Sequence, residues 1–184
     1  MFAKEMVKQS LPLLVTCGIG GIIAGNTLGA MINILKEIPG LIVVIPALIA
    51  LRGNINTTLG SRLGSAYHLG IINSDNLWNE ELKQNIIGSL MLSFLMSIIA
   101  GILAYLSSIL LNVYPNPIVL ISIVLLAGII SGLILTFLTI IIIYLVFRKG
   151  YDPDNITGPA LATFGDIITM FCIFGSAIFI GGLQ

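Results

Sequence analysis

Two stretches of this sequence place polar and charged side chains inside otherwise apolar segments, at 46–64 and at 152–169. They include Arg52, Asn54, Thr57, Thr58 and Ser61 in the first stretch and Asp152, Asp154, Asp166 and Thr169 in the second. Carboxylate, amide and hydroxyl oxygens are the ligands of hard cations, whereas Zn²⁺ and copper favour clusters of thiolate and imidazole. With two cysteines and one histidine in the chain, the pattern indicates hard-cation chemistry.

The composition places these residues in a membrane. Of 184 residues, 57% are hydrophobic and 9% are charged, and eight basic residues balance eight acidic ones. A soluble domain carries about 25% charged residues, so this chain has too little polar surface for a soluble enzyme. It also has no basic patch that could neutralise a row of phosphates, so we expect no nucleic-acid partner.

Five segments are long and apolar enough to cross a bilayer core of ~30 Å as helices. They cover about 11–34, 41–70, 85–111, 118–147 and 156–183. The fold class predicted is therefore all-α, an integral membrane domain of five helices in the lipid of a cell membrane. We expect one domain over 1–184, without a cytosolic regulatory domain.

The basic residues that flank the five segments predict the orientation. One side of the membrane receives Lys4, Lys8, Lys83, Arg148 and Lys149, and the other receives Lys36. Basic residues favour the cytoplasmic side, so the N-terminus is predicted to be cytoplasmic and the C-terminus extracellular. An odd number of helices excludes a complete two-fold repeat, so a symmetric pore requires a second copy of the chain, and we expect a two-fold homodimer.

The two polar stretches are expected to meet at one depth of the membrane. Gly53 lies ~20 Å along a helix that descends from outside, and Asp166 lies ~15 Å along a helix that ascends from inside. Gly53, between Pro46 and Gly60, predicts a break in its helix, and a broken helix exposes carbonyl oxygens that can bind a cation. Arg52 does not fit a cation site, because its charge repels the ion.

Other interpretations of the same residues remain open. Asp166 can be a buried neutral carboxyl group or can pair with Arg52. The amides and hydroxyls of 54–58 can form hydrogen bonds between helices, as such residues do in membranes. Asp152 and Asp154 suit an acidic mouth that concentrates cations or the capping of a helix N-terminus.

Both stretches resemble signatures of the MgtE-like divalent-cation transporters, particularly the solute-carrier branch found in animals. The residues that carry the resemblance are Pro46-Ala47-Leu48, Arg52-Gly53-Asn54, Thr58 to Leu63 and Gly70, followed by Asp152 to Asn155, Pro159 and Asp166 to Thr169. Two separate motifs occur in the correct order, and the likeness extends over about 11–183.

The resemblance implies a pore lined by the second and fifth helices of a dimer. Asp166 matches the pore aspartate that holds hydrated Mg²⁺, and the carbonyl oxygens of Ala162 and Gly53 match positions that face the ion. Asp152 matches an acid near the cytosolic mouth. Two departures limit the comparison: bacterial relatives have cytosolic sensor domains, and animal relatives have two pore domains in one chain.

The predicted function is a Mg²⁺ channel or transporter. A Na⁺- or H⁺-coupled exporter of divalent cations is the alternative within the same class. From other classes, we consider a non-transporting assembly subunit, in which Asp166 pairs with Arg52, and a membrane-embedded enzyme that acts on lipids. The enzyme is disfavoured because a single acidic residue lies deep within a predicted span.

Overall fold

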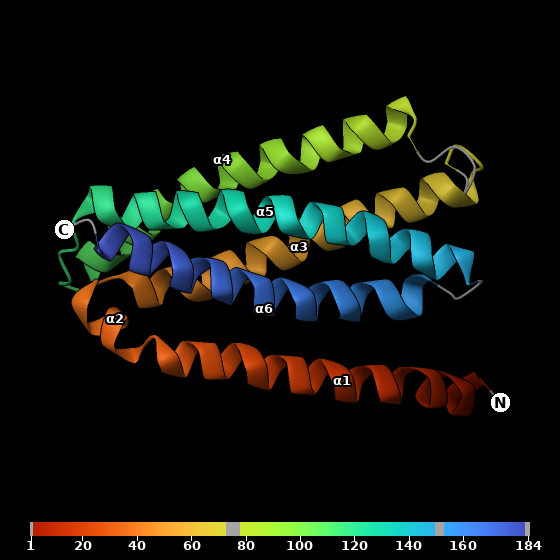
Figure 1. Cartoon of the computed structure of the whole chain (residues 1–184), viewed down its shortest axis with the longest axis horizontal. Coiled ribbons are helices and arrows are strands. Elements are labelled where there is room, and N and C mark those ends of the chain that lie inside the picture. Colours follow the sequence, from red (N-terminus) through yellow and green to blue (C-terminus); the bar gives the residue numbers. More distant parts are fainter. Residues whose placement is uncertain (1, 73–77, 150–152, 183–184) are drawn as a thin grey trace.

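The chain folds into a bundle of long helices in the computed structural model, which describes residues 2–72, 78–149 and 153–182 (Figure 1). The helices are α1 (Phe2–Ala30), α2 (Ile32–Glu37), α3 (Leu41–His68), α4 (Glu80–Leu110), α5 (Pro117–Arg148) and α6 (Pro153–Gly181). All except the short α2 are long and apolar enough to span a membrane, which makes five candidate spans. The described residues contain no strand, so the all-α membrane fold is confirmed.

Two helices begin before their predicted boundaries, and one of them, α4, is capped by a polar side chain. The Asn79 side chain accepts a hydrogen bond from the Leu82 N–H at 2.9 Å, so α4 starts at Glu80 and not near residue 85. The first helix also extends beyond its predicted boundary, to Phe2, and ends at Ala30. Gly40, with φ at +84°, makes the turn from α2 into α3.

The predicted break at Gly53 is wrong, because α3 runs without interruption from Leu41 to His68. Inside a membrane, a break leaves backbone groups without partners. Here the backbone stays helical, and two side chains add bonds to it. The Thr57 hydroxyl donates to the Gly53 carbonyl at 2.8 Å, and the Asn56 amide donates to the Arg52 carbonyl at 2.7 Å.

Helix α5 forms the centre of the bundle and packs against α3, α4 and α6. One apolar cluster, which includes Leu48, Ile123 and Ile173, fills the half of the bundle near α2. A smaller one, which includes Leu63 and Ile143, fills the other half. Helix α4 meets α5 through buried serines, alanines and a glycine, which allow close helix packing in membranes.

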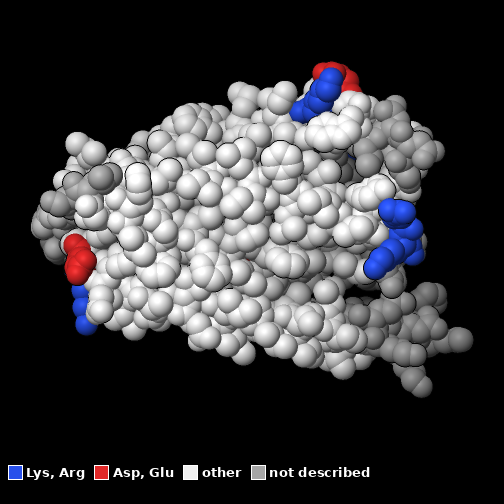
Figure 2. Space-filling view, viewed as in Figure 1, with Lys and Arg blue, Asp and Glu red and all other residues white. Residues whose placement is uncertain are grey.

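The charged side chains visible in Figure 2 gather toward the two ends of the bundle, and the flank between them is uncharged. This distribution suits a bundle that crosses a membrane, because a charge in the hydrocarbon layer costs about 2.5–3.5 kcal/mol even on an insertion scale. The termini lie at opposite ends (Figure 1), as five crossings require.

Candidate cation site

Arg52, the charge that did not fit a cation site, is fully buried between α3 and α4. Its side chain is 0% exposed. The Nη2 group donates hydrogen bonds to the Ser97 hydroxyl at 2.7 Å and to the Ser93 carbonyl at 3.1 Å. The Ser97 hydroxyl in turn donates to the Ser93 carbonyl at 2.6 Å, so its oxygen is free to accept from Arg52. Two residues of α4 thereby hold the guanidinium.

Two glycines of α5 make room for this guanidinium. A Cβ atom at Gly128 would lie 3.0 Å from Arg52 Nη2, and one at Gly132 would lie 2.9 Å from Nη1. The two glycines are one helical turn apart, so they form a shallow depression on α5 beside the arginine. Nε and Nη1 of Arg52 find no hydrogen-bond partner among the described residues.

Arg52 and Asp166 do not form an ion pair. In the part of the chain that the structure describes, the one ion pair joins Lys83 and Glu80 at 3.5 Å on the surface. Arg52 extends toward α4 and α5, whereas the next residue, Gly53, points ~100° away around α3. The interpretation of Asp166 and Arg52 as an interhelical pair is therefore wrong.

Gly53 and Gly165 bring α3 and α6 into close contact. A Cβ atom at Gly165 would lie 3.9 Å from both the Cα and the N atom of Gly53. A Cβ atom at Gly53 would meet nothing within 4 Å, so the space into which a side chain at this position would point is open. Asp166 directly follows Gly165, which places it close to Gly53 in depth, as the sequence predicted.

The predicted residues of α6 differ in how open their surroundings are. Asp166 is half-buried, and Ala162, one turn earlier, is exposed. Thr169, one turn later, is fully buried, and its hydroxyl has no partner among the described residues. Asp166 and Ala162 thus share an accessible face of α6, and Thr169 does not line it.

A polar cavity of about 280 Å³ lies between α3 and α6, beyond Gly53 toward the end of α3. We call it the α3–α6 cavity, and its lining is Thr57, Gly60, Ser61, Gly64, Ser65, His68, Thr157 and Gly158. Of these, the sequence had singled out Thr57 and Ser61 as pore-lining. Thr157 and Gly158 were not predicted as lining residues, although both lie in the second polar stretch. The features that could have indicated them are the hydroxyl group of Thr157 and the small size of Gly158.

Asn54 and Thr58 line a different groove, on the other side of α3. This α3–α4 groove has a volume of about 210 Å³ and is lined by Asn54, Ile55, Thr58, Leu59, Arg62, Gln84, Asn85, Gly88, Ser89 and Leu92. The residues predicted to line one pore are therefore divided between two cavities, because positions 57 and 58 point ~100° apart on the helix.

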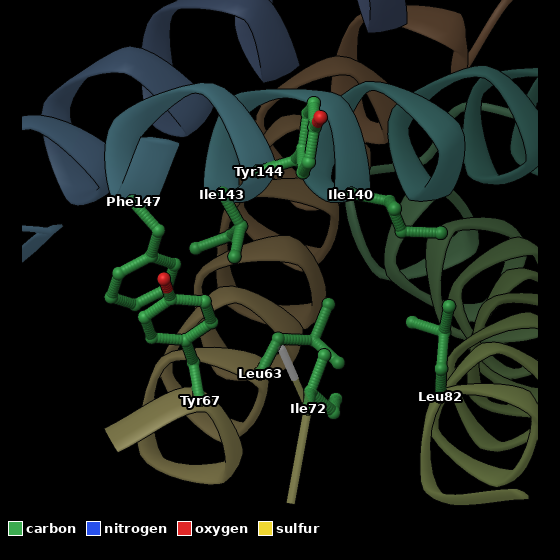
Figure 3. Close-up of a pocket in the computed structure, with 8 residues that line it drawn as sticks. All are labelled: Leu63, Tyr67, Ile72, Leu82, Ile140, Ile143, Tyr144 and Phe147. Carbon is green, nitrogen blue, oxygen red and sulfur yellow. The ribbon is translucent and has the colours of Figure 1, made fainter. Parts of the chain in front are cut away.

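A third pocket lies where the end of α3, the start of α4 and the end of α5 approach one another (Figure 3). It holds about 20 Å³ and is lined by apolar and aromatic side chains. The rings of Tyr67 and Phe147 stack beside it with centroids 3.8 Å apart. A space of this size and apolar lining does not suit a hydrated cation.

Two predicted mouth residues cannot be placed: Asp152 and the side chain of Asp154 lie outside the described residues. Among the described residues, no group of three or more histidine, cysteine, aspartate or glutamate side chains converges on one point. In the part of the chain that the structure describes, Asp166 is the one carboxylate deep within the bundle. This suits a cation that keeps most of its water shell, as Mg²⁺ commonly does.

Comparison with known families identifies the family of this chain. The profile of the MgtE family, described as divalent cation transporter, matches residues 45–176, which include both polar stretches. The chain belongs to the MgtE family. Because this family consists of transporters, the alternative of a membrane-embedded lipid enzyme is set aside.

Individual relatives of this MgtE-family chain are solute carriers of animals. It is 30% identical over 175 residues to solute carrier family 41 member 2 of Gallus gallus and of Homo sapiens, with 90% of this chain and 30% of each relative covered. It is 26% identical over 170 residues to solute carrier family 41 member 3 of Rattus norvegicus, with 88% of this chain and 36% of the relative covered. The chain thus spans about a third of the length of these relatives.

Proposed function

We propose that this chain carries Mg²⁺ across a cell membrane along a path lined by α3 and α6, with Asp166 at its narrow part. The observation that carries the proposal is the position of Asp166. It is a half-buried carboxylate, unpaired with Arg52, on an accessible face next to the Gly53–Gly165 contact. An acidic residue at this depth is costly unless it faces water, an ion or another polar group.

The α3–α6 cavity is evidence for a water-filled path on one side of the Asp166 carboxylate. Thr57, Ser61 and Ser65 supply hydroxyl groups along it, whereas the Thr157 hydroxyl is buried, and glycines keep its walls open. Hydroxyl groups can exchange hydrogen bonds with the water shell of Mg²⁺, which the ion gives up reluctantly. The backbone of Gly53 lies close to Asp166 in depth and that of Ala162 one helical turn away, although the Gly53 carbonyl already accepts from Thr57.

A second copy of the chain completes the path in this proposal. The exposed residues Ser61 and Ser65 of α3 and Ala162 of α6 form a polar or small-residue face that nothing in the described chain covers. Such a face suits contact with water and protein better than contact with lipid. Two copies related by a two-fold axis would bring two Asp166 carboxylates to the path, which matches the charge of one divalent cation.

The orientation is part of the same proposal. Lys83, Arg148 and Lys149 lie where α4 begins and α5 ends, at the end of the bundle where α1 also begins. The positive-inside rule assigns this end to the cytoplasm. The α3–α6 cavity would then open toward the cytoplasm, and the turn at Gly40 would face the outside.

The test is Mg²⁺ flux into proteoliposomes loaded with a fluorescent Mg²⁺ indicator. Asp166→Asn, which keeps the size of the side chain and removes its charge, should reduce the flux to the protein-free background while a cross-linked dimer still forms. Glu80→Gln, which removes a surface acid, is the control and should transport normally. Undiminished flux in Asp166→Asn would contradict the role of Asp166.

The same vesicles separate the channel from the coupled exporter. Flux that follows the Mg²⁺ gradient alone supports the proposal as stated. Flux that requires an imposed Na⁺ or pH gradient supports the coupled exporter. Parallel measurements with Ca²⁺, Mn²⁺ and Co²⁺ determine the selectivity.

A further inference from the structure

The α3–α4 groove lies apart from the proposed ion path and contains a cation that nothing in the described chain neutralises. The Arg62 side chain lines the groove and is exposed. The acids at the start of α4 are occupied elsewhere: Glu80 pairs with Lys83 at 3.5 Å, and the Glu81 carboxylate accepts from the Asn85 amide at 3.0 Å. Arg62 therefore has its donors available for a ligand.

The groove carries its charged side chain at one end and has a mixed polar and aliphatic lining toward the other. Arg62 and Gln84, which both carry N–H donors, lie at the end near the helix termini. Ile55 and Leu92 lie farther into the bundle. Asn54, Thr58 and Ser89 also line this deeper part, so its aliphatic surface comes from Ile55, Leu59 and Leu92. A ligand that fits this lining has an anionic head and an apolar tail.

The depth of Arg62 matches the phosphate layer of a bilayer. Arg62 lies six residues before the end of α3 at His68, which is ~9 Å along the helix. Helix α3 has 28 residues, so it is ~42 Å long and reaches through the core of ~30 Å into both headgroup layers. The guanidinium is thus close to the boundary where lipid phosphates lie.

Gly88 keeps the groove open from the α4 side. It lines the groove, and a Cβ atom added to it would meet nothing within 4 Å. A larger residue there would occupy the groove itself and not the packed interior. This makes Gly88 a position at which the groove can be filled without disturbing the contacts between helices.

We propose that the α3–α4 groove is a binding site for an anionic phospholipid, with the phosphate on Arg62 and Gln84 and an acyl chain along Ile55 and Leu92. Arginine binds phosphate with two parallel charge-assisted hydrogen bonds. A lipid covers the aliphatic part of the groove, which a free phosphate ion would leave exposed. The site does not depend on the proposed transport function.

The experiment measures lipid retention by the full chain in detergent, using native mass spectrometry and the thermal unfolding midpoint. The probes are phosphatidylglycerol, phosphatidylcholine with the same acyl chains, and inorganic phosphate. Phosphatidylglycerol should remain bound and raise the midpoint, whereas the other two should not. Arg62→Gln should weaken phosphatidylglycerol binding about tenfold, through the loss of one charge-assisted contact.

Two matched controls accompany the variants. Gly88→Leu should abolish binding, whereas Gly175→Leu, which fills a groove between α5 and α6, should not change it. Arg148→Gln removes an exposed basic residue at the same end of the bundle and should retain the lipid. Equal stabilisation by inorganic phosphate, or no preference for phosphatidylglycerol, would overturn the proposal. Formation of a disulfide-linked dimer by Thr58→Cys would also overturn the proposal, because it would mean that a second copy of the chain covers the groove.

Discussion

The Arg52 guanidinium donates a hydrogen bond of 2.7 Å to the Ser97 hydroxyl, and it does so with no exposed surface. The bond links α3 to α4 inside a membrane bundle, and the positive charge has no carboxylate partner among the described residues. Neutral hydrogen-bond acceptors compensate only part of the cost of burying a charge. Arg52 therefore acts as a fixed polar link between α3 and α4, ~100° around α3 from Gly53 and the proposed ion path.

The contribution of Arg52 to the free energy of unfolding can be divided into an effect of its volume and an effect of its charge. Arg52→Ala removes the side chain from a packed interior and should lower the unfolding free energy by about 2–5 kcal/mol. Arg52→Met fills most of the same space without burying a charge, so it should cost much less. Chemical denaturation in detergent, followed by circular dichroism, measures both. If Arg52→Met is as unstable as Arg52→Ala, then the hydrogen bonds to α4 and not the volume stabilise the bundle.

The depression on α5 should be sensitive to a single methyl group. A Cβ atom at Gly128 would collide with the Ser97 side chain, so Gly128→Ala should destabilise the bundle by about 1–3 kcal/mol. The control is Gly88→Ala on α4, where a Cβ atom meets nothing within 4 Å. Alanine is a better helix former than glycine, so this control should be neutral or more stable by up to about 1 kcal/mol. Equal stability of the two variants would show that α4 and α5 do not pack as described.

Gly53 and Gly165 should respond differently to the same substitution. Gly165→Leu places a branched side chain against the α3 backbone, so it should separate α3 from α6 and lower the yield of folded protein. Gly53→Leu extends into open space, so it should fold normally but obstruct the proposed path and reduce Mg²⁺ flux. Size-exclusion profiles and proteoliposome flux measure the two effects. Normal flux through folded Gly53→Leu would exclude the open side of Gly53 from the path.

The α3–α6 cavity should be accessible to water-soluble reagents from one side of the membrane. In a background with Cys17→Ala and Cys172→Ala, Ser61→Cys should react with a charged, membrane-impermeant thiol reagent. Leu133→Cys, on an exposed apolar face of α5, should not react, because charged reagents do not enter lipid. Mg²⁺ at millimolar concentration should slow the labelling of Ser61→Cys if the cavity belongs to the ion path. Labelling of Leu133→Cys alone would mean that the cavity is closed to water.

The sequence by itself was sufficient to predict the membrane location, the all-α class and the five spans, because these depend on length and hydropathy, which are local properties. It also placed Asp166 and Gly53 at one depth, since helical rise converts residue number directly into distance. The start of α4 was predicted five residues late, because the run of apolar residues does not reveal the cap formed by Asn79.

Only the tertiary structure decided which sides of the helices face one another. Arg52 and Gly53 are neighbours in the chain, yet one is buried against Ser93 and Ser97 and the other faces open space beside Gly165. Thr57 and Thr58 likewise open into different cavities. Adjacent residues of a helix point ~100° apart, so the neighbours that each one meets depend on how the five helices pack. That packing also removed Arg52 as a partner for Asp166 and left the carboxylate on an accessible face.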